Sequence, residues 1–291
     1  MNYTITHNLT NLTKGNITLT IQAEVGYQLP SSISVSNGTL VSYDSTTGVA
    51  VINGDDTTIV NVVCEAQPSV DPVLANNDWA TIKSVCESGE AGNYWAVGDT
   101  KTDTGTDSAV RTMRICDMQG LYSKHVVFEQ VEQESTTYVW NNSSNVDDNS
   151  AYNNYNIADI RTSLNTTIKA LYSNDLSSNL TLTSVKVAKN GNNGTLLDVT
   201  DYLFLPAEKE IFGSATYSRS EEAAALTQYQ YYASHNTAND RKKLRDGTAK
   251  AWWLRSPNSG DANYVCYVSA GGIANSYYAY DTLGVAPCFA F

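Results

Sequence analysis

Three glutamates stand close together near the middle of the chain, at Glu129, Glu132 and Glu134. Paired carboxyl groups are what glycosidases use for acid–base catalysis, so this spacing raises that chemistry. A solvated strand edge accounts for the same three residues more simply. We therefore expect the three carboxylates to face water and to have no catalytic role.

Other residues with catalytic or metal-binding chemistry are scarce. The imidazoles are limited to His7, His125 and His235, and neither an HExxH nor a GxSxG pattern occurs. The five cysteines form no CxxC pair, which disfavours a zinc site or a disulfide framework. Acidic turns at Asp55 and Asp147 lack the glycine and distal glutamate of an EF-hand. The sequence predicts no catalytic residue, no metal and no cofactor.

The stretch 258–283, NSGDANYVCYVSAGGIANSYYAYDTL, has a composition typical of binding loops. Five of its 26 residues are tyrosine, and the rest are chiefly Ser, Gly, Asn and Ala. Tyrosine supplies contact area at low rotamer cost, and small polar residues supply adaptable hydrogen bonds. An alternative is a loop that simply covers a sheet. We favour a binding region held between fixed strands at 252–257 and 284–291.

Within this region, ten residues are expected to project from one exposed face and bind a partner. Val265 and Val268 would point inward and hold the strand. The ten candidate side chains are Asp261, Tyr264, Tyr267, Ile273, Ser276, Tyr277, Tyr278, Tyr280, Asp281 and Leu283.

Just before this region, the cluster Trp252–Ser256 (WWLRS) combines two aromatic rings with a guanidinium group. Such a cluster can stack on sugars or make cation–π contacts with a ligand. It can equally form a buried scaffold. We expect Arg255 to be a buried structural ion.

The local patterns predict two domains joined by a short linker. Residues 1–67 carry short runs that alternate apolar and polar residues, separated by turn sequences, as in a small β-sandwich. Residues 68–76 follow as a proline-containing linker, or as a loop inside one larger domain. From residue 77 onward the pattern is mixed, with helices expected at 78–89, 157–171 and 220–233. Asp78 is expected to cap the first of these helices and Ser220 the third. A strand-like pattern at 180–189 and 201–213 flanks an Asn/Gly turn.

Charge and hydropathy exclude several classes of function. The formal net charge of −12 argues against a nucleic-acid partner and against contact with anionic lipid. No apolar run approaches the ~20 residues of a membrane span, and the opening MNYTITHNLT does not resemble a secretory signal. We expect no nucleic acid and no membrane insertion. A protein of this kind that works outside a cell would leave by another route, such as assembly into a particle released by lysis.

Two resemblances to known families sharpen these expectations. The segments TITHNLTNLT, GYQLPSSISV and TIVNVVCEA resemble immunoglobulin-like modules of bacteriophage tail proteins. The ordered segments NDWATI, NYWAVGDTK, DYLFLPAEKEIFG, AWWLRSP and GVAPCF resemble an uncharacterised bacterial and phage domain family across 78–291. That resemblance implies an α+β chain: a C-type-lectin-like (formylglycine-generating-enzyme-like) domain, residues 77–291, after an all-β immunoglobulin-like sandwich. Departures from the family pattern are Ala286 and Cys288.

The C-type-lectin-like fold is also used by variable proteins of diversity-generating retroelements, in which adenines of Asn codons are randomised. Such codons never reach Lys, Glu, Gln, Met or Trp. Region 258–283 contains none of these five types, whereas 38 occur in the other 265 positions, a density that would give about four here. The resemblance therefore implies that 258–283 is a diversified binding surface.

The function implied is a phage receptor-binding protein, or tail adhesin, that is not an enzyme. Its partners would be a bacterial surface protein or glycan and, through the N-terminal domain, other tail proteins. A homotrimer would be usual for such a virion protein. One alternative is a bacterial surface adhesin of the same fold. Another is an oxidase of the formylglycine-generating type that uses Cys266 and Cys288.

Overall fold

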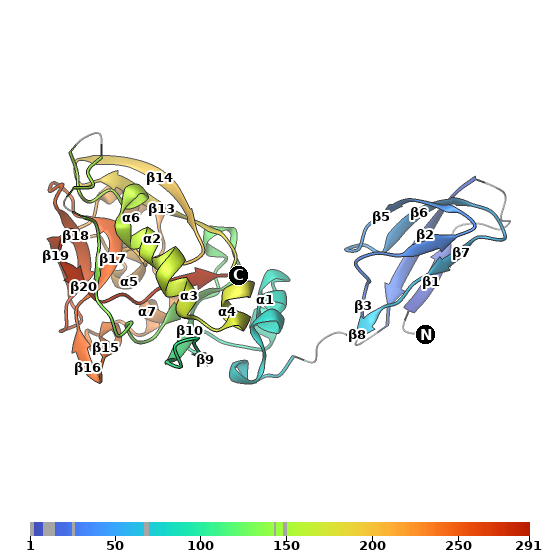
Figure 1. Cartoon of the computed structure of the whole chain (residues 1–291), viewed down its shortest axis with the longest axis horizontal. Coiled ribbons are helices and arrows are strands. Elements are labelled where there is room, and N and C mark those ends of the chain that lie inside the picture. Colours follow the sequence, from blue (N-terminus) through green and yellow to red (C-terminus); the bar gives the residue numbers. More distant parts are fainter. Residues whose placement is uncertain (1–2, 8–14, 25–26, 67–69, 143, 148–149) are drawn as a thin grey trace. The chain divides into compact units, whose positions relative to one another are not determined.

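The computed structural model describes residues 3–7, 15–24, 27–66, 70–142, 144–147 and 150–291. The chain divides into two compact units, Met1–Val70 and Asp71–Phe291 (Figure 1). It is an α+β protein, with mostly strands and a few short helices. The second unit begins at Asp71 rather than at residue 77, because Asn77 exchanges hydrogen bonds with the backbone of Asp71.

The first unit is built of antiparallel strands. They are β1 (Tyr3–His7), β2 (Gly15–Ala23), β3 (Tyr27–Gln28), β4 (Ser34–Ser36), β5 (Thr39–Tyr43), β6 (Val49–Gly54), β7 (Ile59–Asn61) and β8 (Glu65–Ala66). One sheet has the order β1-β2-β6-β5, and β3 pairs with β8 and β4 with β7.

Strand β2 shows why the first unit folds this way. Along GNITLTIQA, Ile17, Leu19 and Ile21 are buried while the threonines between them are exposed, as the period of two in a strand requires. Ile52 of the neighbouring β6 joins the same apolar core. The alternation in the sequence therefore predicted this region correctly as β-rich.

The helices of the second unit are short. The α-helices are α1 (Trp79–Glu87), α2 (Asp159–Ser163), α3 (Lys169–Leu171), α4 (Asn174–Asn179), α5 (Glu208–Phe212), α6 (Ser220–Ala225) and α7 (Gln230–Ser234). Short helical turns are η1 (Leu74–Asn76), η2 (Ala91–Asn93), η3 (Leu121–Ser123), η4 (Tyr155–Ile157), η5 (Leu164–Ile168) and η6 (Asn239–Arg241). The helix expected at 157–171 is present as α2, a π-helical turn η5 and α3 in succession.

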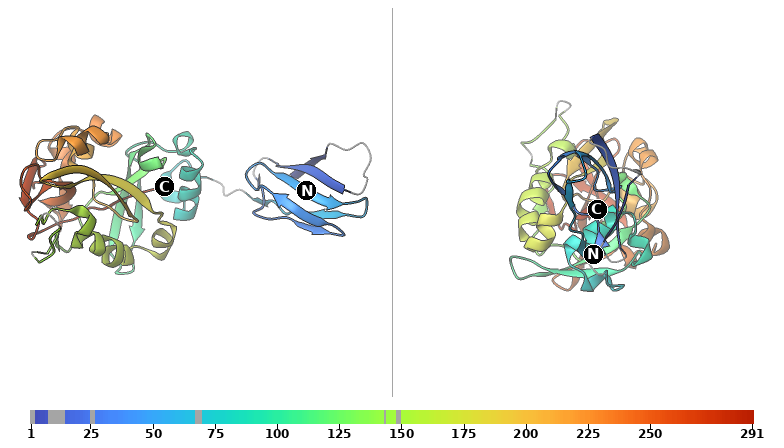
Figure 2. Two further views of the ribbon diagram at one scale, coloured as in Figure 1. Left: turned by 90° about the horizontal axis from the view of Figure 1, so that it is seen from above. Right: turned by 90° about the vertical axis from the view of Figure 1, so that its right-hand side faces the viewer.

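The strands of the second unit form several small antiparallel sheets. They are β9 (Thr100–Thr104), β10 (Val110–Asp117), β11 (Val127–Gln130), β12 (Tyr138–Val139), β13 (Thr183–Asn190), β14 (Asn193–Asp201), β15 (Lys243–Arg245), β16 (Thr248–Lys250), β17 (Trp252–Pro257), β18 (Tyr264–Val268), β19 (Ala274–Tyr278), β20 (Thr282–Leu283) and β21 (Cys288–Ala290). Two sheets have the orders β21-β11-β10-β9 and β17-β18-β19. The remaining pairs are β12-β20, β13-β14 and β15-β16. The long hairpin of β13 and β14 is labelled in Figure 1 and is the yellow pair of strands in Figure 2.

An aromatic core fixes the C-terminal strand of the second unit. The rings of Phe128 and Phe289 stack at 5.1 Å between centroids, across the pairing of β11 with β21. Trp79 of α1 meets both rings edge-on at 5.7 Å. Asp78 caps this helix, accepting a hydrogen bond from the Thr81 amide at 2.7 Å, as the sequence predicted. The C-terminal residues thus close the core of the unit.

Two predicted elements need correction. The helix expected at 220–233 is broken into α6 and α7, and Ser220 is its first helical residue rather than its cap. Between the two helices, Tyr229 is fully buried and donates its amide to the Glu210 carbonyl at 3.0 Å. Burial of this ring overrides the helical propensity of the stretch.

The second correction concerns 201–213, which was expected to be strand-like. The strand after the Asn/Gly turn is β14, which starts at Asn193, and the EKEIF segment forms helix α5. Glu208 and Glu210 on this helix are buried and hydrogen-bonded, a placement that hydrophobic periodicity does not reveal.

Candidate functional site

The tyrosine-rich region folds into a hairpin at the edge of a sheet. Strand β18 lies between β17 and β19, and β19 is the outer strand of this three-stranded sheet (Figure 1). The register pairs Trp253 with Tyr267 across β17 and β18, and Tyr264 with Tyr278 across β18 and β19. The hairpin therefore has one edge paired with β17, and the other edge, along β19, is unpaired among the described strands.

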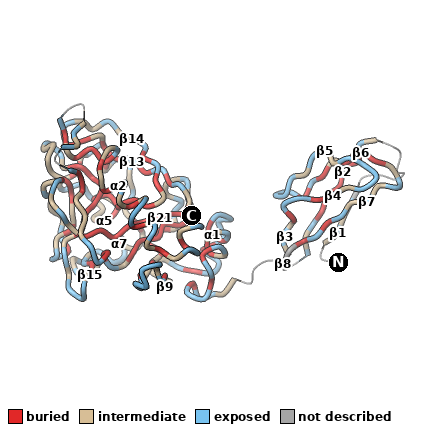
Figure 3. Tube along the Cα trace, in the orientation of Figure 1, coloured by how far each residue is buried: buried red, intermediate tan, exposed pale blue. Residues whose placement is uncertain are grey.

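Exposure divides this region into a buried minority and an accessible majority (Figure 3). None of the ten candidate side chains is buried. Ile273 is 57% exposed, and Tyr277 and Tyr280 are each 41% exposed, whereas the other seven are partly exposed. Val265 and Val268 are fully buried, as predicted.

The expectation of a single exposed face was too simple. Tyr264, Ser276 and Tyr278 lie on one side of the hairpin by strand alternation and register. Tyr267 and Tyr277 lie on the other side, because neighbouring residues of a strand point in opposite directions. The candidate surface therefore wraps around the free edge of β19.

Ring contacts join the two sides into one continuous aromatic surface. Tyr278 lies 4.4 Å from Tyr264 and 5.0 Å from Tyr280 between ring centroids. Tyr277 bridges to the other side, at 6.0 Å from Tyr278 and 6.2 Å from Tyr267. Tyr152, from outside the region, meets Tyr280 edge-on at 5.9 Å.

The first half of the region is held through its main chain by Asn153. The side-chain NH2 of Asn153 donates to the carbonyls of Asp261 and Tyr264, both at 2.7 Å. Its side-chain oxygen accepts a hydrogen bond from the backbone N–H of Gly191 at 3.0 Å. Gly191 in turn accepts from the Gly260 amide at 2.9 Å. A Cβ at Gly191 would lie 2.4 Å from the Asp261 carbonyl oxygen, so only glycine allows this approach.

The second half is held in the same way. At the hairpin tip, the Arg241 guanidinium donates to the Gly272 carbonyl at 3.1 Å. Gly272 has φ +79°, and a Cβ there would collide with the Ala238 carbonyl. Farther along the chain, the backbone N–H of Asn141 donates to the Ala279 carbonyl at 2.9 Å. These anchors give no signal in the sequence, because Asn153 and Arg241 lie in polar segments without a distinguishing pattern.

All of these anchors bind main-chain atoms of the hairpin and not its outward side chains. Within the part of the chain that the structure describes, no hydrogen bond from outside 258–283 ends on any of the ten candidate side chains. The backbone position of the hairpin is thus set independently of the identity of those side chains.

The electrostatic surroundings of the tyrosines are acidic. A hydrogen bond with Tyr278, together with burial and the nearby Asp261, raises the pKa of Tyr264 to about 12. Burial, Tyr278 and Asp281 raise the pKa of Tyr280. The two aspartates therefore disfavour a phenolate on this surface and place negative potential beside the rings.

Strand β17, in contrast, is fully buried and acts as scaffold. Arg255 makes two hydrogen bonds to the Glu210 carboxylate, at 2.5 and 2.6 Å, and both residues are inaccessible. Trp252 and Trp253 donate their indole N–H groups to the carbonyls of Arg241 and Tyr138, respectively. Arg255 is thus the buried structural ion that the sequence predicted.

The expectation that the three glutamates face water is wrong for two of them. Glu129 is buried and pairs with Lys243 at 2.8 Å, and Glu134 is buried and pairs with Arg111 at 2.8 Å. A buried carboxylate is tolerated when a cation pairs with it, and Lys243 and Arg111 supply those cations. Lys243 is far from Glu129 in the sequence, so the pairing could not be read from local pattern. Glu132 is exposed.

The cysteines considered for oxidase chemistry are both fully buried free thiols. Burial raises the pKa of Cys266 and of Cys288 well above the usual thiol range, which opposes thiolate formation. Cys266 lies 4.0 Å from a Glu208 oxygen, whereas the Cys288 backbone pairs with Phe204. Each sulfur therefore sits in its own environment within the packed interior.

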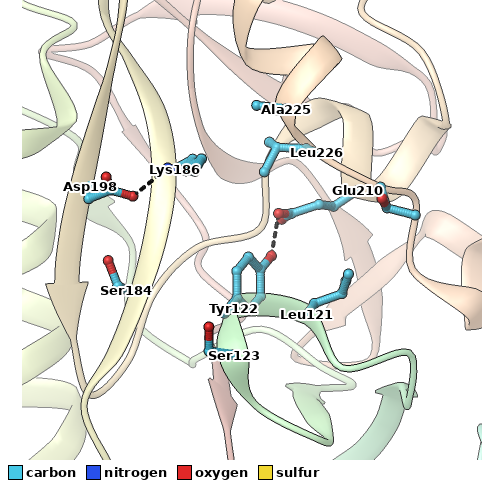
Figure 4. A pocket seen from close by; sticks show the side chains of 10 residues that line it. Leu121, Tyr122, Ser123, Ser184, Lys186, Asp198, Glu210, Ala225 and Leu226 are labelled. Carbon is cyan, nitrogen blue, oxygen red and sulfur yellow. Dashed lines mark hydrogen bonds and ion pairs between the residues drawn. The ribbon is translucent and has the colours of Figure 1, made fainter.

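A cavity of about 390 Å³ opens on another part of the second unit, between η3, β13 and the end of α6. Lys186 pairs with Asp198 on one wall, and Tyr122 donates to Glu210 on another (Figure 4). Tyr122 and Ser123 both have positive φ, at 59° and 57°. Lys186 and Tyr122 are thus each engaged with an acidic partner, and Ser123, Ser184 and Thr227 complete the polar lining of the cavity.

The part of the chain that the structure describes contains neither a metal-binding cluster nor a helix that could span a membrane. No group of three or more His, Cys, Asp or Glu side chains in the described ranges is arranged to hold a metal ion. No helix among these residues is long and apolar enough to cross a membrane. His125 and His235 are exposed, and His235 stacks on Tyr231 at 4.3 Å.

Comparison with known proteins identifies a family for most of the second unit. No curated protein matches the chain, and no solved structure does. A family model, a domain of unknown function designated DUF6273, matches residues 123–291, which include the scaffold strand β17 and the whole tyrosine-rich region. The chain belongs to the DUF6273 family.

Proposed function

We propose that this protein is a phage receptor-binding protein, or tail adhesin, whose tyrosine-rich hairpin binds a ligand on the bacterial surface. In this proposal the second unit is a C-type-lectin-like domain of the kind diversified by retroelements. The first unit is an immunoglobulin-like module that attaches the protein to other tail components.

The observation that carries the proposal is the way the hairpin is anchored. Asn153, Arg241 and the Asn141 amide all hold it by main-chain carbonyls. Buried Val265 and Val268 fix the strand from within. A surface built in this way tolerates replacement of its outward side chains, because its backbone does not depend on them. That property is what a diversified binding surface requires.

The chemistry of the outward side chains supports the same function. Tyrosine combines a large ring with a polar tip and loses little rotamer entropy on binding. Contacts among Tyr264, Tyr278 and Tyr280 further restrict these rings before any partner arrives. A pre-ordered aromatic surface reduces the entropic cost of association.

The first test is deep sequencing of the 3′ end of the gene across the population from which the sequence came. We expect differences to concentrate at adenine-derived codons between Pro257 and Gly284, while the WWLRSP and GVAP segments stay constant. Uniform sequence in 258–283 would remove diversification and leave a binder of fixed specificity.

The second test is the triple variant Tyr277→Ala, Tyr278→Ala and Tyr280→Ala. We expect loss of binding to a panel of bacterial isolates and a nearly unchanged melting temperature. The matched control replaces three tyrosines outside the hairpin surface, such as Tyr94, Tyr202 and Tyr231, by alanine. Retained binding by the triple variant would refute the proposed function, and a collapse of stability would identify the rings as core.

The place of the protein in a virion has its own test. Mass spectrometry of purified phage particles should detect the chain together with tail components. Detection on bacterial envelopes and absence from particles would favour the bacterial adhesin instead.

A further inference from the structure

The hairpin surface carries negative charge with no cation of its own. Region 258–283 contains Asp261 and Asp281 and has no Lys, Arg or His. Both aspartates contribute to the raised pKa of Tyr280, after burial and Tyr278. Asp261 also adds to the raised pKa of Tyr264, after its hydrogen bond with Tyr278 and burial.

Cations near the region are committed elsewhere. Arg219 pairs with Glu221 at 3.0 Å and donates to the Gly191 carbonyl. Arg241 donates to the Gly272 carbonyl and lies over the ring of Phe212 at 4.8 Å. Neither guanidinium forms an ion pair with Asp261 or Asp281 among the described residues. The surface is therefore open to a cation supplied by a partner.

The rings beside the aspartates have the arrangement that attracts a cation. Tyr278 lies between Tyr264 and Tyr280 at 4.4 and 5.0 Å, and Tyr152 adds a ring edge-on to Tyr280. The faces of aromatic rings attract Lys and Arg. Because Tyr264 and Tyr280 pack against Tyr278, a cation would meet the remaining faces of Tyr264 and Tyr280 and the phenol oxygens, and a neighbouring carboxylate strengthens that attraction.

The apolar character of the tip indicates what kind of molecule supplies the cation. Ile273 is 57% exposed at the turn between β18 and β19, and Tyr277 is 41% exposed toward the other end of β19, where it pairs with Val265. An exposed aliphatic side chain gains by burial against apolar groups, which a protein surface offers and a hydroxyl-rich glycan offers poorly.

We propose that the partner of this hairpin is a protein with a basic patch, and that one of its Lys or Arg side chains contacts the rings of Tyr264, Tyr278 and Tyr280 between Asp261 and Asp281. The inference rests on the proposed function and names the partner class for the same surface. Tyr277 provides an apolar contact beside Tyr278, at 6.0 Å between ring centroids, and Ile273 provides a second apolar contact at the hairpin turn.

The test uses the full chain with ¹³C-labelled tyrosine rings and a defined probe. The probe is a 15-residue peptide of five Lys-Gly-Ser repeats, titrated at low salt and followed by NMR. We expect shifts at Tyr264, Tyr278 and Tyr280, assigned through single Tyr→Phe variants. A peptide with Glu in place of Lys should leave these signals unmoved.

A charge-matched pair of variants separates a specific site from general attraction to an acidic protein. Asp261→Asn with Asp281→Asn removes two charges from the hairpin, and Asn keeps the oxygen that accepts from the Asn263 amide. Glu87→Gln with Glu90→Gln removes two exposed charges elsewhere in the second unit. We expect the first pair to weaken peptide binding at least fivefold and the second to change it less than twofold.

Either of two results would overturn the inference: equal loss in both pairs, or the absence of Lys-peptide shifts at these rings. Shifts produced instead by a neutral oligosaccharide, such as maltoheptaose, would assign the surface to glycans. These failures are distinct from failure of the proposed function. If the triple tyrosine variant still loses binding to bacterial isolates while the Lys peptide does nothing, the binding surface stands and only its basic partner is rejected.

Discussion

Strand β17 and the hairpin that follows it are neighbours in sequence and in space, but the structure holds them by opposite means. In β17 the side chains make the bonds: Arg255 to Glu210, Ser256 to Glu222, and both indoles to carbonyls. In the hairpin the main chain receives the bonds, and the outward side chains contact mostly one another.

This difference indicates where substitutions are costly. Replacing a β17 side chain leaves a buried partner without its bond, and an unpaired buried polar group is expensive. Replacing an outward hairpin side chain changes what the surface presents and leaves its position intact.

Breaking the Arg255–Glu210 pair should be the most damaging change. Arg255→Met leaves the Glu210 carboxylate buried with no cation, a loss that typically costs about 3–5 kcal/mol. Urea unfolding followed by fluorescence would measure it. A decrease in the free energy of unfolding of less than about 1 kcal/mol would show that the pair does not hold β17 in place.

The second prediction concerns Glu222, whose pKa is raised to about 7 by burial. The folded state then holds a proton that the unfolded state has released above its usual pKa of 4.5. The contribution of Glu222 to the free energy of unfolding is therefore fully present below pH 4.5, and it is lost as the pH rises toward 7.

Glu222→Gln, which cannot ionise, should remove this dependence. The unfolding free energy of the variant relative to the natural protein should rise between pH 5 and 8, by at most about 3 kcal/mol. Glu129→Gln serves as the contrast, because Lys243 and Arg114 overcome burial and lower the pKa of Glu129 to about 2. A pH-independent difference for Glu222→Gln would contradict the raised pKa.

Asn153→Ala should have a somewhat smaller and more local effect. It removes three hydrogen bonds between Asn153 and the main chain of Asp261, Tyr264 and Gly191, worth about 1 kcal/mol each. We expect a loss of about 2–3 kcal/mol and faster amide hydrogen exchange in 258–264. Unchanged exchange there would mean that Asn153 is not the anchor.

The smallest effect is expected on the hairpin surface itself. Tyr277→Ser should alter the unfolding free energy by about 0.5 kcal/mol or less, because the ring is 41% exposed. Trp253→Ser, one strand away, should cost several times more, since its indole is buried and bonded. Thermal unfolding of both variants would compare them directly, and equal losses would remove the contrast.

Local sequence patterns predicted much of the fold. Alternation along β2, the Asp78 cap and the periodic helix at 157–171 act over a few residues, and each was recognised. The tyrosine-rich composition of 258–283 likewise located the candidate surface. Its division over two sides of the hairpin followed only once the register of β18 with β19 was known.

The sequence by itself determined the β-rich first unit, the helix capped by Asp78, the helical segment at 157–171, and the region whose side chains reach the surface. Tertiary structure alone decided which buried charges meet, since Glu210 and Arg255 are 45 positions apart and Glu129 and Lys243 are 114 apart. It also decided that Asn153 anchors a chain segment 108 positions away. The physical reason is one of range: periodicity and capping act within a few turns of chain, whereas these partners are chosen by the packing of the whole unit.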